Sequence, residues 1–393
     1  MAVCALGITQ ITAWGTSYYC LGILAASIAA DTGWSRSLVF SGFTVALLTM
    51  GLVSTRAGRA IDEYGARSVM AVGTIIVSCG LYLLSLVRIE ATYLAVWILI
   101  GLGMRLCLYD AAFAALVQIA PSRGRRAISY LTLFGAFASS VFWVIGHFLN
   151  EALGWRQTLV VFALINFVVC LPLNWYGLAR RESPDVRNSA EEAAHVTREG
   201  HPLAGRARSV AIGLFALIMS LNAFVFGVIT VQLVPILEAA GLAAGVAVWV
   251  ASMKGFAQFA GRLTEIIFGA SLRSITVARI AIGVLPLSLL LLISGGSFHA
   301  IVAFTLLMGA SQGVITIVRG AVPLALFGAN GYGAVLGLIA TPILVVNAAA
   351  PTAFAWIVDQ WGWFTAELTL LASAVASLLA MELMSRWVER NRK

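Results

Sequence analysis

The stretch LAAGVAVWVASMKGFAQFAGRLTEIIFGA, residues 242–270, is long and apolar enough to cross a bilayer as one helix, yet it contains two cations. Lys254, Gln258 and Arg262 follow one another at intervals of four residues, so a helix places them on one face. A cation near the bilayer centre costs at least ~2.5–3.5 kcal/mol and is seldom found there without a partner or a function. The pattern predicts a membrane helix whose charged face lines a cationic cavity.

Composition extends this interpretation to the whole chain. Of its 393 residues 61% are hydrophobic and 11% are charged, and the mean hydropathy is +0.95. A soluble domain carries about 25% charged residues. Spanning helices need roughly 20 apolar residues, and continuous apolar runs favour helices over a barrel. We predict an all-α integral membrane protein with twelve transmembrane helices, near 3–29, 37–57, 69–87, 91–120, 127–149, 157–179, 209–236, 243–268, 277–296, 299–320, 333–356 and 365–385.

The net charge is +8, and the basic residues are divided unequally between the loops of the two sides. This division predicts the orientation in the membrane. Nineteen of the 25 basic residues fall in alternate loops and the C-terminus, whereas the opposite loops hold Arg36, Arg88 and Arg156. By the positive-inside rule both termini are cytoplasmic. The basicity therefore sets topology in a lipid bilayer, and no nucleic-acid partner is expected.

A polar segment divides the chain. Residues 180–208 read RRESPDVRNSAEEAAHVTREGHPLAGRAR, which has no apolar periodicity and indicates a cytoplasmic linker. It separates an N-terminal six-helix bundle, 1–179, from a C-terminal one, 209–393. We therefore predict two pseudo-symmetric bundles. In membrane transporters built from two repeated bundles, the substrate site lies near the midplane where the halves meet.

The two halves match at an offset of 208 residues. Gly33 corresponds to Gly241, and the group Glu151, Gly154 and Trp155 corresponds to Asp359, Gly362 and Trp363. This offset pairs Arg262 with Ser54, about two turns inside the membrane. A competing match of AGR at 57–59 with AGR at 260–262 would instead place Arg262 at the cytoplasmic edge, with its side chain reaching the interface.

The loop between the second and third spans carries a family resemblance. GRAIDEYGAR, residues 58–67, places Gly58, Asp62, Gly65 and Arg67 in the pattern GxxxDxxGxR. Glycines permit a tight turn, and the aspartate can cap a helix end or pair with an arginine. With the 6+6 division of spans, the loop resembles that of the major facilitator superfamily. The resemblance implies that this loop latches the inner side of one conformation.

Within that superfamily the chain resembles bacterial relatives of the monocarboxylate and oxalate/formate transporters. Arg125 and Arg126 lead into a fifth span with small residues, and AGRL at 260–263 is similar to the eighth-span arginine of that group. The resemblance implies that Arg262 holds a substrate carboxylate and that the protein lies in a bacterial inner membrane. Alternatively, Glu265 pairs with Arg262 and neutralises it.

Span four carries two opposite charges. Arg105 and Asp110 lie five residues apart, which is roughly 140° on a helix, so they are not expected to face each other. Asp110 is the candidate proton carrier, and the alternative is a permanent salt bridge. Tyr109 shares the Arg105 face. Lys254 is a carboxylate anchor, a titrating group or a partner of Asp110.

Polar and aromatic residues in other spans complete the candidate substrate site, although helix–helix hydrogen bonding is the alternative for each. The full set of candidate substrate-binding residues is Arg262, Lys254, Gln258, Arg105, Tyr109, Trp14, Tyr18, Gln10, Asn222, Gln312 and Asn347.

These residues favour a monomeric secondary transporter that moves a small organic anion, a mono- or dicarboxylate, by alternating access. Protons or a counter-anion would drive it. An efflux carrier for drugs or other toxic anionic compounds is the alternative, and a non-transporting membrane sensor is a third hypothesis. The sequence has no HExxH motif and no P-loop, so no enzyme activity, metal or cofactor is expected.

Overall fold

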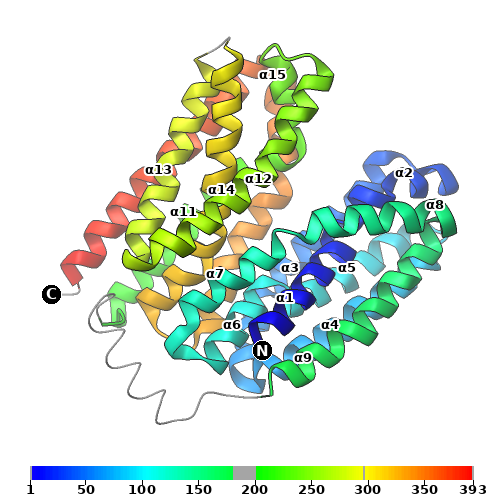
Figure 1. Ribbon diagram of the computed structural model, residues 1–393, viewed down its shortest axis with the longest axis horizontal. Coiled ribbons are helices and arrows are strands. Elements are labelled where there is room, and N and C mark those ends of the chain that lie inside the picture. The colour runs from blue at the N-terminus through cyan, green and yellow to red at the C-terminus, as the bar shows by residue number, and fades with distance from the viewer. Residues whose placement is uncertain (1, 180–200, 295–296, 392–393) are drawn as a thin grey trace. The chain divides into compact units, whose positions relative to one another are not determined.

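The computed structural model describes residues 2–179, 201–294 and 297–391, and every regular element within these ranges is a helix (Figure 1). The first half contains α1 (Ala2–Ala13), η1 (Trp14–Tyr18), α2 (Cys20–Thr32), α3 (Arg36–Tyr64), α4 (Ala66–Ser85), α5 (Glu90–Cys107), α6 (Tyr109–Ile119), η2 (Pro121–Arg123), α7 (Gly124–Gly135), α8 (Ala138–Ile165), η3 (Asn166–Cys170) and α9 (Leu171–Gly177). The second half contains α11 (Gly205–Ala239), α12 (Ala244–Phe268), η4 (Gly269–Ser271), α13 (Ser274–Ile293), α14 (Phe298–Phe327) and α15 (Tyr332–Asn391).

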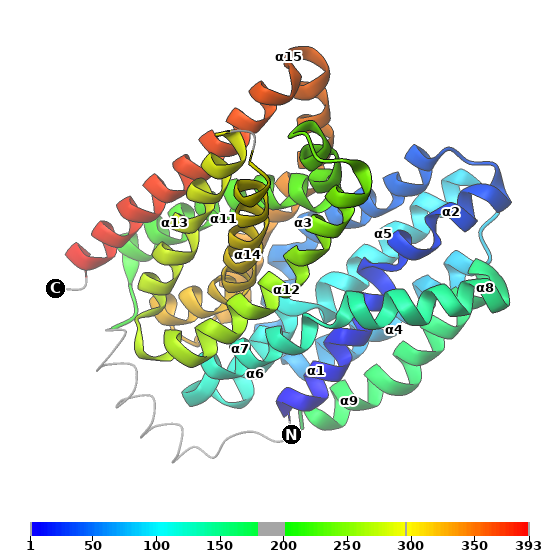
Figure 2. The same ribbon diagram turned by 45° about the horizontal axis from the view of Figure 1, so that its top comes forward.

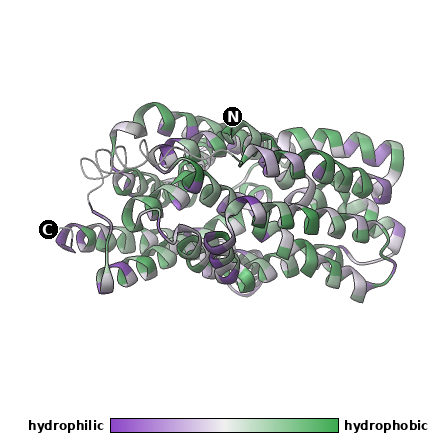
Figure 3. Cartoon of the chain, turned by 90° about the horizontal axis from the view of Figure 1, so that it is seen from below, coloured by the Kyte–Doolittle hydropathy of each residue, from purple (hydrophilic) through white to green (hydrophobic). Residues whose placement is uncertain are grey.

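The helices have the length and composition of membrane spans. Among the described residues, nine continuous helical stretches are long and apolar enough to cross a bilayer. Two of the nine are 54 and 60 residues long and are interrupted by Gly154 and Gly362. Helix α12 is not among the nine, and it carries Lys254, Arg262 and Glu265. Hydrophobic residues predominate along the helices, as the colouring of Figure 3 shows. The all-helical membrane fold is confirmed, whereas the number of twelve spans stays a prediction.

The described residues form two compact units. Unit 1 contains residues 2–179 together with 329–341, and unit 2 contains 201–328, apart from 295–296, and 342–391. Helix α15 passes from one unit to the other at Pro342, whose missing N–H removes one helical hydrogen bond. In unit 1, α1 lies beside α7 and α9, and α4 beside α5 and α8 (Figures 1 and 2). In unit 2, α14 packs against α12 and α13. The predicted domain boundaries stay a prediction, because most of the predicted linker, 180–200, lies outside the described residues.

The backbone repeats at the 208-residue offset. Gly33 and Gly241 have φ of 73° and 97°, and Gly154 and Gly362 have φ of 79° and 80°. These positive values explain why glycine occupies all four positions. The offset is therefore confirmed at the predicted positions.

A helix crossing repeats at the same offset. A Cβ on Gly101 of α5 would lie 2.5 Å from the carbonyl oxygen of Ala46 on α3, and one on Gly309 of α14 would lie 2.7 Å from that of Lys254 on α12. Both pairs are related by 208 residues. The match extends the offset into α12, so it favours the alignment of Arg262 with Ser54 over its placement at the cytoplasmic edge.

The predicted fourth span is not a continuous helix. It consists of α5 and α6, which are separated by Leu108 with φ −81° and ψ −167°, an extended conformation. Extended backbone inside a membrane protein needs other partners for the carbonyl groups that leave the helical ladder. Those partners define the first part of the candidate site.

Candidate functional site

A side chain from α1 forms a hydrogen bond with the backbone beside the break at Leu108. The Gln10 amide nitrogen donates a hydrogen bond of 2.9 Å to the carbonyl of Cys107, and the Trp14 indole donates one of 3.2 Å to the Gln10 amide oxygen. Gln10 is fully buried. Its amide is thus engaged with the protein at both ends, and its placement fits support of the helix break better than ligand contact.

The same break brings the two charges of the fourth span together. Arg105 Nη1 lies 3.6 Å from Asp110 Oδ2, and the two side chains are 1% and 7% exposed. The Arg105 Nε donates a further hydrogen bond of 2.6 Å to Ser54 Oγ on α3. The expectation that Arg105 and Asp110 face away from each other was therefore wrong, because it assumed a continuous helix and the extended residue between them changes the angle.

Trp14, Tyr18 and Tyr109 lie together in unit 1. The Trp14 ring centroid is 4.6 Å from that of Tyr18 and 5.0 Å from that of Tyr109. All three side chains are half-buried. Three predicted site residues from α6 and the α1–η1 segment therefore form one aromatic group.

In unit 2 the charged helix α12 is held closely against α14. Gly309 and Gly313 of α14 face the backbone of Lys254 and Gln258, where a Cβ would overlap a carbonyl group. Small residues at this spacing let two membrane helices approach. The Gln258 amide nitrogen donates a hydrogen bond of 2.6 Å to the Gln312 amide oxygen. Two more predicted site residues are thereby joined.

Lys254 lies beside this pair on α12 and is half-buried. Within the part of the chain that the structure describes, no carboxylate forms an ion pair with its ammonium group. Arg262, two turns further along, is buried, as is Glu265 one turn beyond it. The predicted cationic face is therefore a run of half-buried and buried polar groups along α12.

The two predicted asparagines of unit 2 contact neighbouring helices. The Asn222 amide nitrogen donates hydrogen bonds of 2.7 Å to the Ile218 carbonyl and 2.5 Å to Ser377 Oγ, and its side chain is buried. Asn347 lies against Gly227 of α11, where an added Cβ would be 3.1 Å from its amide oxygen. Asn222 is placed as a helix–helix contact, as the alternative interpretation expects.

The GxxxDxxGxR loop contacts the start of α15 within unit 1. The Asp62 carboxylate accepts hydrogen bonds of 2.9 Å from the Gly333 N–H and 2.7 Å from the Ala334 N–H. These donors are in the first turn of α15, where N–H groups lack helical partners and the helix dipole favours an anion. Gly58 allows the contact because a side chain there would overlap the Gly333 carbonyl.

The rest of the loop has separate contacts. Gly65, with φ 82°, links α3 to α4. The Arg67 guanidinium lies 4.1 Å from the ring centre of Trp175. Asp62 thus caps a helix of the second half of the sequence, and Arg67 stacks on α9.

Residues 309–313, GASQG, have the spacing of the GxSxG nucleophile motif, but their setting does not fit one. That motif places serine on a sharp strand-to-helix turn. Here the five residues lie inside α14, and buried Ser311 donates a hydrogen bond of 2.8 Å to the Ala281 carbonyl. The glycines serve the contact with α12, and the serine joins α14 to α13.

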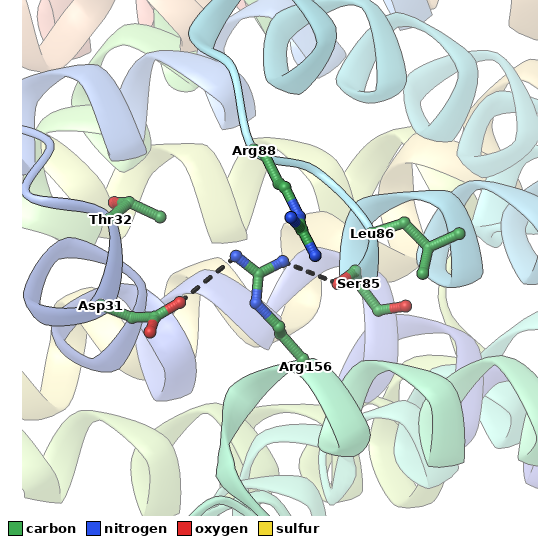
Figure 4. A pocket seen from close by; sticks show the side chains of 6 residues that line it. All are labelled: Asp31, Thr32, Ser85, Leu86, Arg88 and Arg156. Atoms are coloured by element: carbon green, nitrogen blue, oxygen red, sulfur yellow. Dashed lines mark hydrogen bonds and ion pairs between the residues drawn. The ribbon is translucent and has the colours of Figure 1, made fainter.

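A separate polar pocket lies at one end of unit 1, where α2 ends and α4 connects to α5 (Figure 4). Arg156 donates hydrogen bonds of 2.8 Å to the carbonyls of Ser85 and Val87 and lies 3.3 Å from the Asp31 carboxylate. Arg88 points into the same pocket (Figure 4). Sequence patterns gave no signal for this group beyond the presence of two arginines in predicted outer loops.

Sequence reasoning also missed Glu367, a buried carboxyl group in α15. The sequence already indicated this residue, because it is an acidic residue inside the predicted span 365–385.

Apolar helices, a repeated backbone and buried charges within the spans define a polytopic membrane protein built from a duplicated helical unit. The family model of the Major Facilitator Superfamily matches residues 6–293. The chain belongs to this superfamily, whose members are transporters that carry small molecules. Comparison with curated proteins gives no match.

Solved structures share the fold over almost the whole chain. The human organic anion transporter MFSD10 (TETRAN) is 14% identical, with a TM-score of 0.75 and coverage of 97% of this chain and 98% of that one. FucP in the outward conformation is 14% identical, with a TM-score of 0.72 and 98% coverage of both chains. The proton:xylose symporter XylE, bound to 6-bromo-6-deoxy-D-glucose, is 13% identical, with a TM-score of 0.67 and coverage of 97% and 94%. At these identities the likeness shows the fold alone.

Proposed function

We propose that this transporter moves a small organic anion, a mono- or dicarboxylate, by alternating access across the inner membrane of a bacterium. Its relatives would be the monocarboxylate and oxalate/formate transporters, and it would act as a monomer. The low identity of the solved structures leaves the substrate class to be argued from residues of this chain.

One observation carries the proposal. The Lys254 ammonium lies near the middle of α12 with no ion-pair partner among the described residues. A lysine at the bilayer centre costs ~2.5–3.5 kcal/mol, and such residues mark ion or substrate pathways. An anionic substrate would supply the missing countercharge. Arg262, on the same face, would add the planar two-point hydrogen bonding that suits a carboxylate.

Asp110 is the proposed proton carrier. Its carboxyl group is buried beside Arg105, so gain or loss of one proton would change the charge of the pair. Arg105 would then respond to the protonation of Asp110 and need not bind substrate. The bonds from Gly333 and Ala334 to Asp62 support the role of the 58–67 loop as a latch of one conformation.

The test is competitive uptake of a carboxylate against its amide, which has the same shape but no charge. Lys254→Gln should weaken competition by the carboxylate more than by the amide. Arg262→Lys keeps the charge but loses the planar group, so carboxylate affinity should fall while affinity for the amide changes less. Lys254→Arg is the control that retains a cation. Equal losses for acid and amide would show that both cations serve structure and would overturn the anion proposal.

The proposed orientation has its own test. A cysteine introduced into the linker should resist membrane-impermeant reagents in intact cells if both termini are cytoplasmic. Labelling from outside would contradict the topology.

A further inference from the structure

Five aromatic rings form a continuous row in unit 1, which we term the aromatic wall: Phe43, Tyr18, Trp14, Tyr109 and Phe113. Successive ring centroids along this row are 4.8, 4.6, 5.0 and 5.3 Å apart. These separations lie in the range of direct aromatic contact. The rings come from α3, η1 and α6, which are distant in sequence.

Most residues of the wall are not fully covered by the rest of the protein. Phe113 is fully buried at one end, but the other four side chains are half-buried. The Trp14 indole N–H is already committed to Gln10, so this residue offers a ligand its ring and no donor. Ring faces bind apolar or aromatic groups, and their negative quadrupole repels a carboxylate.

The backbone beneath the wall is distorted. Trp14–Tyr18 form a π-helical turn, in which the Tyr19 N–H donates a hydrogen bond of 2.9 Å to the Trp14 carbonyl five residues earlier. Such turns are rare and occur frequently at functional sites. Gly15 lets the Phe142 ring pack closely against this turn, because a side chain there would overlap the ring. The distorted turn carries Tyr18 and Trp14, the second and third rings of the wall.

We infer that the anionic substrate carries an aromatic ring and that the aromatic wall of unit 1 binds this ring. The inference rests on the proposed anion transport and narrows its substrate class. A carboxylate with only two or three carbon atoms would leave the wall without a ligand contact. Trp14 is the specificity residue at the centre of the row.

The experiment varies charge and aromaticity separately. Apparent affinities are taken from the thermal stabilisation of the purified full-length protein at increasing ligand concentration, because a ligand stabilises the state that it binds. The probes are benzoate, cyclohexanecarboxylate, benzylamine, D-glucuronate and oxalate. Benzoate should bind about 3- to 10-fold more tightly than cyclohexanecarboxylate, given the range for aromatic pairs.

Two variants and a control locate the effect. Trp14→Leu should reduce the ratio of benzoate to cyclohexanecarboxylate affinity to about one, and Trp14→Phe, which keeps a ring, should retain most of it. Trp143→Leu removes an exposed tryptophan outside the wall and should leave the ratio unchanged. The melting temperature without ligand shows whether each variant folds. If Trp14→Leu does not fold, Trp14→Phe and the wild-type ratio still decide the question.

The failures of the inference and of the proposed function are distinguishable. Equal affinity for benzoate and cyclohexanecarboxylate, tighter binding of glucuronate, or binding of oxalate without benzoate would overturn the aromatic substrate and leave anion transport standing. Binding of benzylamine as tightly as benzoate would overturn the anion proposal and, with it, the inference of an aromatic anion. If none of the probes stabilises the protein, both fall.

Discussion

Units 1 and 2 each place a buried guanidinium at the same helix crossing, but they supply it from opposite helices. In unit 1, Arg105 of α5 reaches Ser54 of α3. The 208-residue offset relates Ser54 to Arg262 of α12, and Arg105 to Gly313 of α14. The arginine of unit 1 is therefore on α5, whereas the arginine of unit 2 is on α12, the counterpart of α3. The repeat fixes how the helices cross, whereas single side chains decide which helix bears the charge.

Arg105 and Lys254, a second cation of α12, also differ in their surroundings. Arg105 has Asp110 beside it because the helix breaks at Leu108. The equivalent position in unit 2, Thr316, lies within the continuous helix α14. Lys254 has no ion-pair partner among the described residues. The charge of Arg105 is therefore neutralised within unit 1, and we propose that the charge of Lys254 is left for the substrate.

The largest expected effect comes from breaking the ion pair of unit 1. Asp110→Asn should lower the free energy of unfolding by about 3–5 kcal/mol, because it leaves the buried Arg105 without its countercharge. Uphill transport should be lost. The measurements are denaturant unfolding of the purified protein and uptake with and without a proton gradient.

The double variant Arg105→Gln with Asp110→Asn is the control. It should regain stability and substrate exchange but no uphill transport if Asp110 carries protons. Recovery of uphill transport would show that the pair is structural alone.

The cation of unit 2 should behave in the opposite way. Lys254→Met should leave the free energy of unfolding unchanged or raise it by about 1–3 kcal/mol, because it removes a cation that is costly in the membrane. Arg105→Met, made in parallel, should destabilise. The same unfolding measurement compares them. A loss of stability in Lys254→Met similar to that in Arg105→Met would mean that both cations are neutralised internally, and the contrast between the units would disappear.

The shared helix crossing gives a third comparison. Gly101→Ala and Gly309→Ala should each cost about 1–3 kcal/mol, because the new methyl group meets a backbone carbonyl of the facing helix. Gly255→Ala is the matched control on α12, where an added Cβ meets nothing within 4 Å, and it should gain up to about 1 kcal/mol from helix propensity. If only one of these two glycine variants loses stability, the packing at the two crossings is not equivalent.

The smallest effect is expected at the loop of unit 1. Asp62→Asn should lower stability by about 0.5–1 kcal/mol, because it removes a charge from the N-terminus of α15 but keeps one acceptor oxygen. Glu63→Gln, at the exposed neighbouring residue, should have no effect. Unfolding and initial transport rates are the measurements. Equal behaviour of the two variants would remove Asp62 from the proposed latch.

The sequence by itself determined the membrane environment, the all-helical fold and the repeat, because these depend on local apolar length and on glycines with positive φ. The predicted span 243–268 matches α12, Ala244–Phe268. Lys254, Gln258 and Gln312 could also be selected from the sequence as polar residues in apolar runs, whereas their role in substrate binding stays a prediction. Phe43 and Phe113 had no such signal, since a phenylalanine in a span is ordinary.

The tertiary structure alone decided which of these side chains meet. Residues 104–110 read MRLCLYD, without proline or glycine, so nothing local indicates the break at Leu108. Its stabilisation includes a hydrogen bond from Gln10, 97 residues away from Cys107 in the chain. The Arg105–Asp110 pair depends on that break. Long-range packing supplies the partners that local sequence lacks, and for this reason the ion pair and the aromatic wall could not be predicted from spacing.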